Sequence, residues 1–109
     1  MQLKKNWDTL IAFVGSNYPF KLKEVGTTHW YSPNTGATNE YGFTALPGSY
    51  RDENGEWPQG HDSVLGSGAN WWTSTNETPT TAYISRMGID MNTFAGKKIT
   101  GCSIRCVRD

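Results

Sequence analysis

The chain has 109 residues and carries ten basic against ten acidic side chains, so its formal net charge is zero. This length predicts a single domain over residues 1–109, and the charge balance excludes the basic footprint of a protein that binds nucleic acid or anionic lipid. No stretch approaches the roughly 18 apolar residues of a membrane span, and the first residues lack the apolar run of a signal peptide, so membrane insertion is not expected.

The composition predicts a loop-rich domain with an aromatic core. Twelve glycines supply many turns, and aromatic residues make up 13% of the chain. Each large aromatic side chain buries roughly 150 to 250 Å² and so offsets the entropy that ordering such loops costs.

The first predicted element is a helix over residues 3–14. Its apolar residues recur with a 3.6-residue period: Leu3, Trp7, Leu10, Ile11 and Val14. Gly15 follows as a C-terminal stop. None of residues 1–3 is a good N-cap, so we expect the helix either to fray at its start or to be the remainder of a longer segment.

Glycines and prolines punctuate the chain after Gly15, which argues against a second long helix. Residues 20–25 fit one helical turn or a short strand, and residues 31–40 are expected to be a loop. Asn54-Gly55 predicts a type I′ hairpin or another tight turn, because both residues tolerate positive φ.

Three strands are predicted in the last third of the chain, over residues 70–75, 82–87 or beyond, and 101–107. Gly96-Lys97-Lys98 is expected to form the turn or loop before the last of them. Trp71 and Trp72 would point to opposite faces of a strand, so one packs in the core and the other lies under a loop or offers a stacking platform. We expect large stability losses on substitution of three core candidates: Phe43, Leu46 and Trp72.

The residue pattern predicts neither catalysis nor a metal or cofactor. The histidines His29 and His61 are far apart, and no C-x-x-C pair is present. His61-Asp62-Ser63 has the residue types of a hydrolase triad, but sequence neighbours do not form that geometry. The acidic segment 52–56 could hold calcium through its oxygens, although it lacks the spacing of an EF-hand and a plain turn is the simpler interpretation.

The two cysteines, Cys102 and Cys106, would lie four residues apart on one strand. That separation is about 13 Å, too far for a disulfide. We expect small buried residues there, with a free thiol or a pair between chains as the alternatives.

Three ordered motifs resemble one known family: GFTALPGSYR at residues 42–51, WWTST at 71–75 and GCSIRCVRD at 101–109. On these motifs the whole chain is similar to the Fibrobacter succinogenes major paralogous domain. The resemblance implies an α+β fold of the C-type-lectin-like branch that includes formylglycine-generating enzymes, with one N-terminal helix, short twisted antiparallel strands and long loops. The chain departs from the family pattern at four positions: Ser49, Asn70, Asn76 and Cys102.

The resemblance also implies a first strand segment before the helix, and we expect this chain to lack that segment. In C-type-lectin-like folds that strand pairs near the last one. We therefore expect an open edge at residues 101–107, which either frays or pairs with a second copy in a homo-oligomer.

The implied function is that of a non-enzymatic module, at the cell surface or secreted, that recognises a glycan or protein ligand. The lectin calcium motifs are absent, so calcium-dependent sugar binding is not favoured. The alternatives are a spacer domain of bacterial surface proteins without a ligand, or a variable ligand-binding protein of the diversity-generating-retroelement type.

Variable positions in those retroelement relatives lie between the Trp-containing strand and the terminal motif. The corresponding interval here mixes aromatic, charged and amide side chains, as recognition surfaces do. Alanine at Tyr83 and Arg86 is expected to abolish binding without lowering stability. The predicted ligand-binding residues are Tyr83, Ser85, Arg86, Asp90, Asn92, Thr93 and, from the Trp pair, Trp71.

Overall fold

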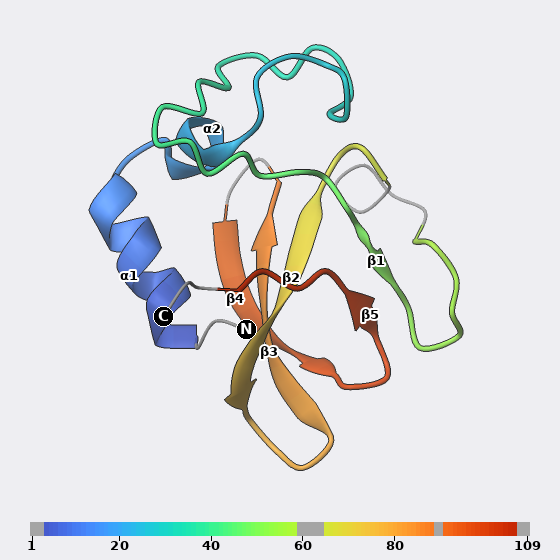
Figure 1. The fold of residues 1–109 in the computed structure, drawn as a ribbon. Helices are drawn as coiled ribbons and strands as arrows, with labels where there is room; N and C mark the ends of the chain where they lie inside the picture. Colours follow the sequence, from blue (N-terminus) through green and yellow to red (C-terminus); the bar gives the residue numbers. More distant parts are fainter. Residues whose placement is uncertain (1–3, 59–64, 89–90, 107–109) are drawn as a thin grey trace.

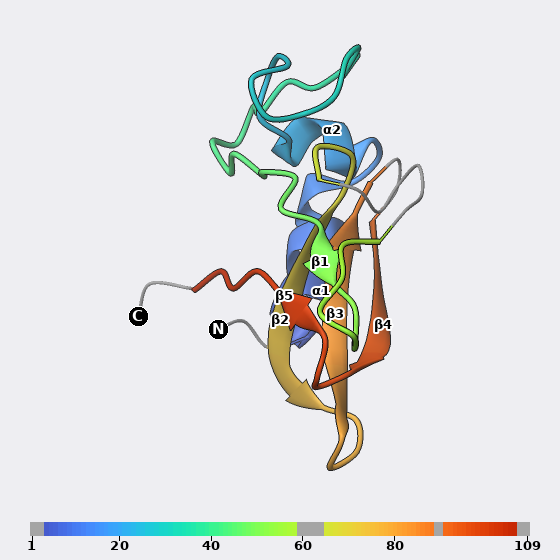
Figure 2. The ribbon, with the colours of Figure 1, turned by 90° about the vertical axis from the view of Figure 1, so that its right-hand side faces the viewer.

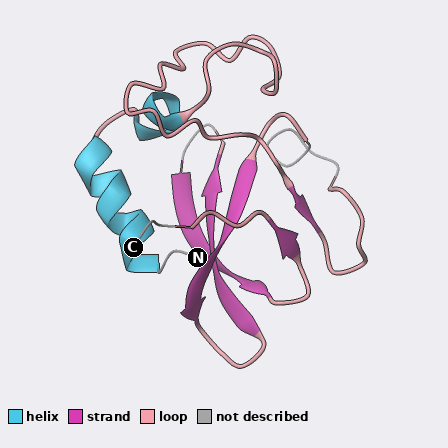
Figure 3. Cartoon of the chain, viewed as in Figure 1, coloured by secondary structure: helices cyan, strands magenta, loops and turns pink. Residues whose placement is uncertain are grey.

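A computed structural model describes residues 4–58, 65–88 and 91–106, and its elements confirm the predicted α+β class (Figure 3). Two helices are followed by five strands: α1 (Lys4–Val14), α2 (Tyr18–Leu22), β1 (Tyr50–Arg51), β2 (Ala69–Asn76), β3 (Thr81–Met87), β4 (Met91–Lys97) and β5 (Gly101–Cys102). The longest helix in these ranges has 11 residues, well short of the roughly 20 that cross a bilayer. Accordingly, no membrane-spanning helix is found among the described residues.

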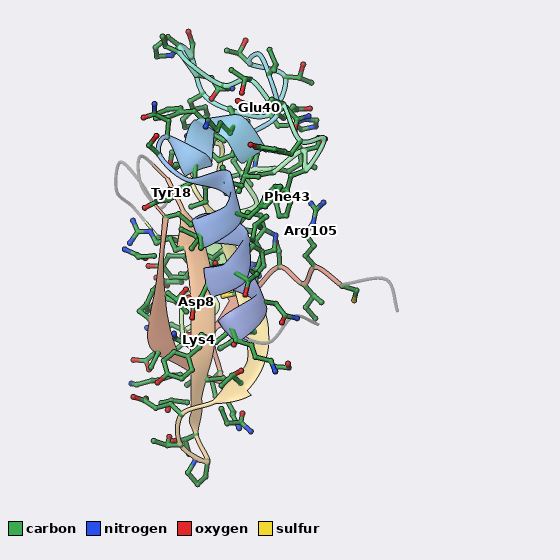
Figure 4. The ribbon with its side chains drawn as sticks, turned by 90° about the vertical axis from the view of Figure 1, so that its left-hand side faces the viewer. Lys4, Asp8, Tyr18, Glu40, Phe43 and Arg105 are labelled. Atoms are coloured by element: carbon green, nitrogen blue, oxygen red, sulfur yellow. The ribbon has the colours of Figure 1, made fainter. Side chains whose placement is uncertain are left out.

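Helix α1 lies against one face of the sheet, as Figure 4 shows from the helix side. Trp7 and Val14 are buried on its inner side. The helix ends as predicted, because Gly15 adopts φ +75 and its amide donates to the Ile11 carbonyl at 3.0 Å. At its start, the amide of Lys4 donates to Thr75 Oγ1 at 3.0 Å. A residue of β2 thus satisfies a helix N–H that the local sequence does not cap.

Strands β2, β3 and β4 form an antiparallel sheet in that order. A bulge interrupts the β2–β3 register between Trp72 and Asn76. Strand β4 was not predicted: Gly96 and Lys97, expected in a turn, belong to it, and the turn follows at Lys97–Thr100, where the Thr100 amide donates to the Lys97 carbonyl. Pairing with β3 along its whole length overrides the weak strand preference of Asn, Ala and Gly.

Strands β1 and β5 form a two-stranded ribbon beside β2, on the side of the sheet away from α1 (Figures 1 and 2). Just after β5, the Ser103 amide donates to the Asn70 carbonyl and the Ser103 carbonyl accepts from the Trp72 amide, both at 3.0 Å. The terminal segment therefore lies between β1 and β2. The predicted open edge at 101–107 is wrong for residues 101–103; the strand ends at Cys102, and residue 107 lies outside the described ranges.

Asn54-Gly55 forms a tight turn, but not the type I′ hairpin. Only Gly55 has a positive φ (+77), and its amide donates to the Asp52 carbonyl at 2.9 Å. The strand that precedes the turn, β1, pairs with the distant β5 instead of with the residues after the turn.

The long segment between α2 and β1 passes over one end of the sheet in loops (Figure 1), as predicted for residues 31–40. Residues 20–25, left open between helix and strand, complete α2 and then form an isolated bridge from Lys23 to Ala45. Trp30 fixes this segment, because its indole Nε1 donates to the Ala45 carbonyl at 2.9 Å.

The core is an aromatic cluster under α1. The rings of Trp7 and Trp71 stack with centroids 5.1 Å apart, and Phe43 meets both edge-on. Of the three predicted core residues, Phe43 packs against this cluster, Trp72 is only half-buried and Leu46 is 45% exposed. The core tryptophan of the pair is Trp71, at 5% exposure.

Candidate functional site

The predicted ligand-binding residues are divided between the two faces of the sheet. Side chains alternate between faces along a strand, and the register sets Trp71, Ser85 and Thr93 in one row across three strands. This row faces α1, because Trp71 stacks on Trp7. Arg86 pairs with Asn92 in the next row, so both lie on the opposite face, which we call the outer face.

On the helix face the side chains are covered. Trp71 and Ser85 are 5% and 0% exposed, and Thr93 Oγ1 is buried. Tyr83 is half-buried with the Lys4 ammonium 5.6 Å from its ring centroid. Surface contact of Trp71 and Ser85 with a ligand does not fit this burial, because α1 occupies the space above them. The remaining predicted residue, Asp90, lies outside the described residues.

A cavity of about 220 Å³ opens on the outer face, and we call it the outer cavity. The sheet and the β1–β5 ribbon both contribute to it. Its lining residues are Asn70, Ile84, Arg86, Phe94 and Gly96 from the sheet, and Tyr50, Thr100 and Cys102 from the ribbon and the turn before β5.

Strand pairing sets the positions of these side chains. Tyr50 and Cys102 are cross-strand partners in the ribbon, so both side chains point to the same side of it. In the sheet, Ile84 is paired with Phe94, and Asn70 with Arg86. The hydrogen bonds of Ser103 to β2 hold the ribbon against the sheet edge, which joins the two halves of the cavity.

Gly96 leaves part of the cavity wall without a side chain. Its φ is not positive, so the backbone does not require glycine there. A Cβ at this position would instead collide with the end of the Ile84 side chain. Glycine inside a strand weakens the strand and often marks a place where another group approaches closely.

Asn70 is the most deeply buried of the residues that line the outer cavity. Its side chain is 1% exposed, and its Nδ2 atom is buried without a hydrogen-bond partner. A buried donor without a partner costs about 1 to 3 kcal/mol, and such groups are rare in folded proteins. Trp7 Nε1, Ser85 Oγ and Thr93 Oγ1 share this unpartnered state on the helix side of the sheet.

The cavity is rich in hydrogen-bond donors. The Arg86 guanidinium donates only, and Tyr50 and Thr100 each carry a hydroxyl. Cys102 is a neutral thiol at physiological pH, because burial raises its pKa to about 11. None of the described lining residues is acidic.

Two other hollows lie near the outer cavity. One of about 300 Å³ is lined by the half-buried Trp72 together with Ala82 and Lys98, and one of about 240 Å³ by Arg51 and Trp57 beside the ribbon. None of the buried side-chain atoms that lack a partner in the described part of the chain lines either hollow. The outer cavity is therefore the stronger candidate.

The acidic turn at 52–56 is explained without calcium. Asp52 Oδ1 accepts from the amides of Asn54 and Glu56, both at 2.9 Å, and so closes the turn. No group of three His, Cys, Asp or Glu side chains gathers in residues 4–58, 65–88 and 91–106. The segment His61-Asp62-Ser63 lies outside these ranges. Neither Cys102 nor Cys106 forms a disulfide.

Of the outer-cavity residues, sequence reasoning found Arg86 and missed the others. Two carried a signal: Asn70 is an amide beside the Trp pair in a strand-like segment, and Gly96 is a glycine inside a strand. The ribbon residues carried none, because they reach the site only through pairing of segments that lie far apart in sequence.

A family model described as the Fibrobacter succinogenes major domain matches residues 3–108, nearly the whole chain. No curated protein and no solved structure matches the chain.

Proposed function

The chain belongs to the Fibrobacter succinogenes major domain family, and from this premise we propose that it is a non-enzymatic binding module that takes its ligand in the outer cavity. The observation that carries the proposal is the outer cavity itself, where the hydroxyls of Tyr50 and Thr100 and the aromatic ring of Phe94 come together. As in the resemblance described above, the ligand is a glycan or protein group, the setting is the cell surface or the exterior, and the fold is C-type-lectin-like.

The chemistry of the cavity favours binding over catalysis. The described lining residues include no histidine or carboxylate that could act as a general base. The one nucleophile of useful type, Cys102, stays protonated at neutral pH because its pKa is raised to about 11. Aromatic rings of Tyr50 and Phe94 beside the polar groups fit recognition of a sugar or an amphipathic side chain.

The test is a ligand titration followed by NMR amide shifts and thermal melts, with Phe94→Ala as the cavity variant. Phe94 is 41% exposed, so its loss should leave the fold intact. The matched control is Ile99→Ala, at a residue 69% exposed that does not line the cavity. Tyr83→Ala serves as a second control, because Tyr83 lies on the helix face.

We expect ligands to raise the melting temperature and to shift amides of β2, β3 and the ribbon. Phe94→Ala should weaken binding about tenfold or more, since an aromatic wall contributes on the order of 1.4 kcal/mol, while both controls bind as the parent chain does. Equal binding by Phe94→Ala and Ile99→Ala would place the ligand elsewhere. No response to any glycan or peptide would favour the spacer alternative.

A further inference from the structure

We propose that β4 is the surface through which two copies of this chain associate, by antiparallel pairing of β4 with β4 around Phe94. The inference goes beyond the proposed function, because it concerns a protein partner and not the ligand. It rests on the backbone groups that β4 leaves unpaired and on the side chains beside them.

Strand β4 forms one edge of the three-stranded sheet. It pairs with β3 along its whole length, and in Figure 2 no described element lies beyond its other side. The opposite edge of the sheet is closed, because Ser103 bonds to β2. The edge that can accept a further strand is therefore β4, whereas the sequence predicted an open edge at residues 101–107.

The hydrogen bonds at the end of β4 show which of its backbone groups face outward. Lys98, directly after the strand, donates its amide to the Thr80 carbonyl at 2.9 Å. In an antiparallel pair, residues that bond across the pair alternate with residues that face away from it. Every second residue before Lys98 therefore bonds to β3. The residues that face the free side are Met91, Thr93, Ala95 and Lys97.

The two outer members of this set already have partners for their carbonyls. The Tyr18 hydroxyl donates to the Met91 carbonyl at 3.1 Å, and Figure 4 shows Tyr18 at this end of β4. At the other end, the Lys97 carbonyl accepts from the Thr100 amide at 3.0 Å. For Thr93 and Ala95, the described part of the chain provides no partner on the free side. Both residues thus offer an N–H and a C=O to a further strand.

One register of β4 against a second β4 pairs all of these groups. With Phe94 opposite Phe94 of the second copy, each Thr93 lies opposite an Ala95. Each such pair exchanges two hydrogen bonds, so the N–H and C=O of both residues are satisfied in both copies. The neighbouring symmetric registers instead bring Ala95 opposite Met91, or Thr93 opposite Lys97, whose carbonyls are already bonded. The free edge is therefore complementary to itself in the register centred on Phe94.

The side chains along β4 fit the same register. Phe94 is 41% exposed, and its ring would meet the ring of the second copy at the closer of the two spacings in an antiparallel pair. Asn92 would lie opposite Gly96, which has no side chain to obstruct it. Natural edges are often protected by proline, charge or a bulge. Strand β4 has no proline and no bulge, and its one charge, Lys97, is at its end.

Association through one strand is expected to be weak but to have a defined geometry. Seven residues extend about 23 Å, so the interface belongs to the small class below about 1,200 Å², and we expect a Kd on the order of 100 μM. The two-fold axis of such a dimer is perpendicular to the sheet, which keeps both outer faces on the same side. A ligand with repeated units could then bind both outer cavities at once.

The experiment measures the mass of the full chain by analytical ultracentrifugation from micromolar to millimolar concentration, in the parent, Ala95→Pro and Ala95→Val. Proline removes the outward N–H of residue 95 and is tolerated at an edge where this N–H faces solvent. Valine is the matched control, because it keeps the N–H and favours a strand. Amide NMR spectra and thermal melts report whether each variant is folded.

A pair of cysteine variants tests the register without the proline. In a background of Cys102→Ser and Cys106→Ser, Phe94→Cys is compared with Asn92→Cys under mild oxidation. The two copies of residue 94 lie opposite each other, with Cβ atoms roughly 4.5 to 5.5 Å apart. The two copies of residue 92 are displaced by about 13 Å along the strands, which is beyond the reach of a disulfide.

We expect the mass of the parent to rise from that of one chain, 12.1 kDa, toward twice this value as the concentration increases. Ala95→Val should follow the parent, and Ala95→Pro should associate about tenfold more weakly or not at all, because each copy loses a donor. Phe94→Cys should form the cross-linked dimer at least about tenfold faster than Asn92→Cys.

A parent chain that keeps the mass of one copy up to about 1 mM would overturn the proposal. Association of folded Ala95→Pro as tight as that of the parent would show that β4 is not the interface. Equal rates of cross-linking in the two cysteine variants would show that the register is wrong. None of these measurements uses a ligand, so their failure leaves the proposed binding function standing, and failure of ligand binding leaves the dimer standing.

Discussion

Replacing Trp71 and Trp72 by alanine, one at a time, tests how the faces of the sheet are assigned. The two rings are adjacent in sequence, yet only Trp71 is buried, at 5% exposure, between Trp7 and Phe43. Trp72 is half-buried and lines a hollow of about 300 Å³ on the outer face. The same substitution of tryptophan by alanine should therefore lower the free energy of unfolding by different amounts at Trp71 and Trp72.

The expected magnitudes follow from burial. Deleting a buried tryptophan costs about 3 to 5 kcal/mol, out of a total stability of roughly 5 to 15 kcal/mol for a domain. For Trp72 we expect about 1 to 2 kcal/mol, because much of its ring keeps contact with solvent. At this chain length about 1 kcal/mol corresponds to roughly 4 °C in Tm. Trp71→Ala should then lower Tm by about 12 to 20 °C, and Trp72→Ala by about 4 to 8 °C.

The assay is thermal and chemical denaturation followed by far-UV circular dichroism, which does not depend on tryptophan emission. Trp57→Ala is the control for loss of an indole as such, because Trp57 is 43% exposed in a turn region; it should cost less than about 1 kcal/mol. If Trp72→Ala cost as much as Trp71→Ala or more, the assignment would be refuted, since a register slip of one residue in β2 exchanges its two faces.

Two further predictions concern the terminal segment. In single-cysteine variants, Cys102 should react with a disulfide reagent at pH 8 more slowly than the exposed Cys106, because burial raises the Cys102 pKa to about 11 and leaves little thiolate. The native state favours the protonated Cys102 thiol, so the contribution of this thiol to the free energy of unfolding is complete below about pH 9 and is lost as pH rises toward 11. Cys102→Ser has no such thiol and should not show this loss. An equal loss of stability between about pH 9 and 11 in the variant would contradict the prediction. Arg105→Met should cost about 0.5 to 2 kcal/mol, because the guanidinium lies 3.7 Å from the Phe43 ring centroid (Figure 4). The same cost in a Phe43→Leu background would show that this ring contact contributes nothing.

Local signals predicted the elements whose pattern is strong on its own. The 3.6-residue period and Gly15 located the first helix and its end, and β-rich residues located β2 and β3. Strand β4 was missed because Asn92, Ala95 and Gly96 have weak strand preference, and pairing to β3 is what makes them a strand. The predicted terminal strand was too long, because pairing to β1 extends over only two residues.

The candidate site was harder to predict because a strand alternates its faces. Tyr83, Ser85 and Arg86 form a compact run in sequence, yet two of them lie on the helix face and one on the outer face. The ribbon residues Tyr50 and Cys102 reach Arg86 only through long-range pairing, which no local pattern reports.

Burial of Trp71 and the proposed ligand site depend on the same register. With Trp71 under α1, Asn70 must point to the outer face, where it stands beside Arg86. A slip of one residue in β2 would turn Asn70 toward the helix and leave Arg86 without its amide neighbour. The stability difference between Trp71→Ala and Trp72→Ala is therefore also a test of the cavity, because Asn70 and Arg86 line it together only if Trp71 is the buried ring.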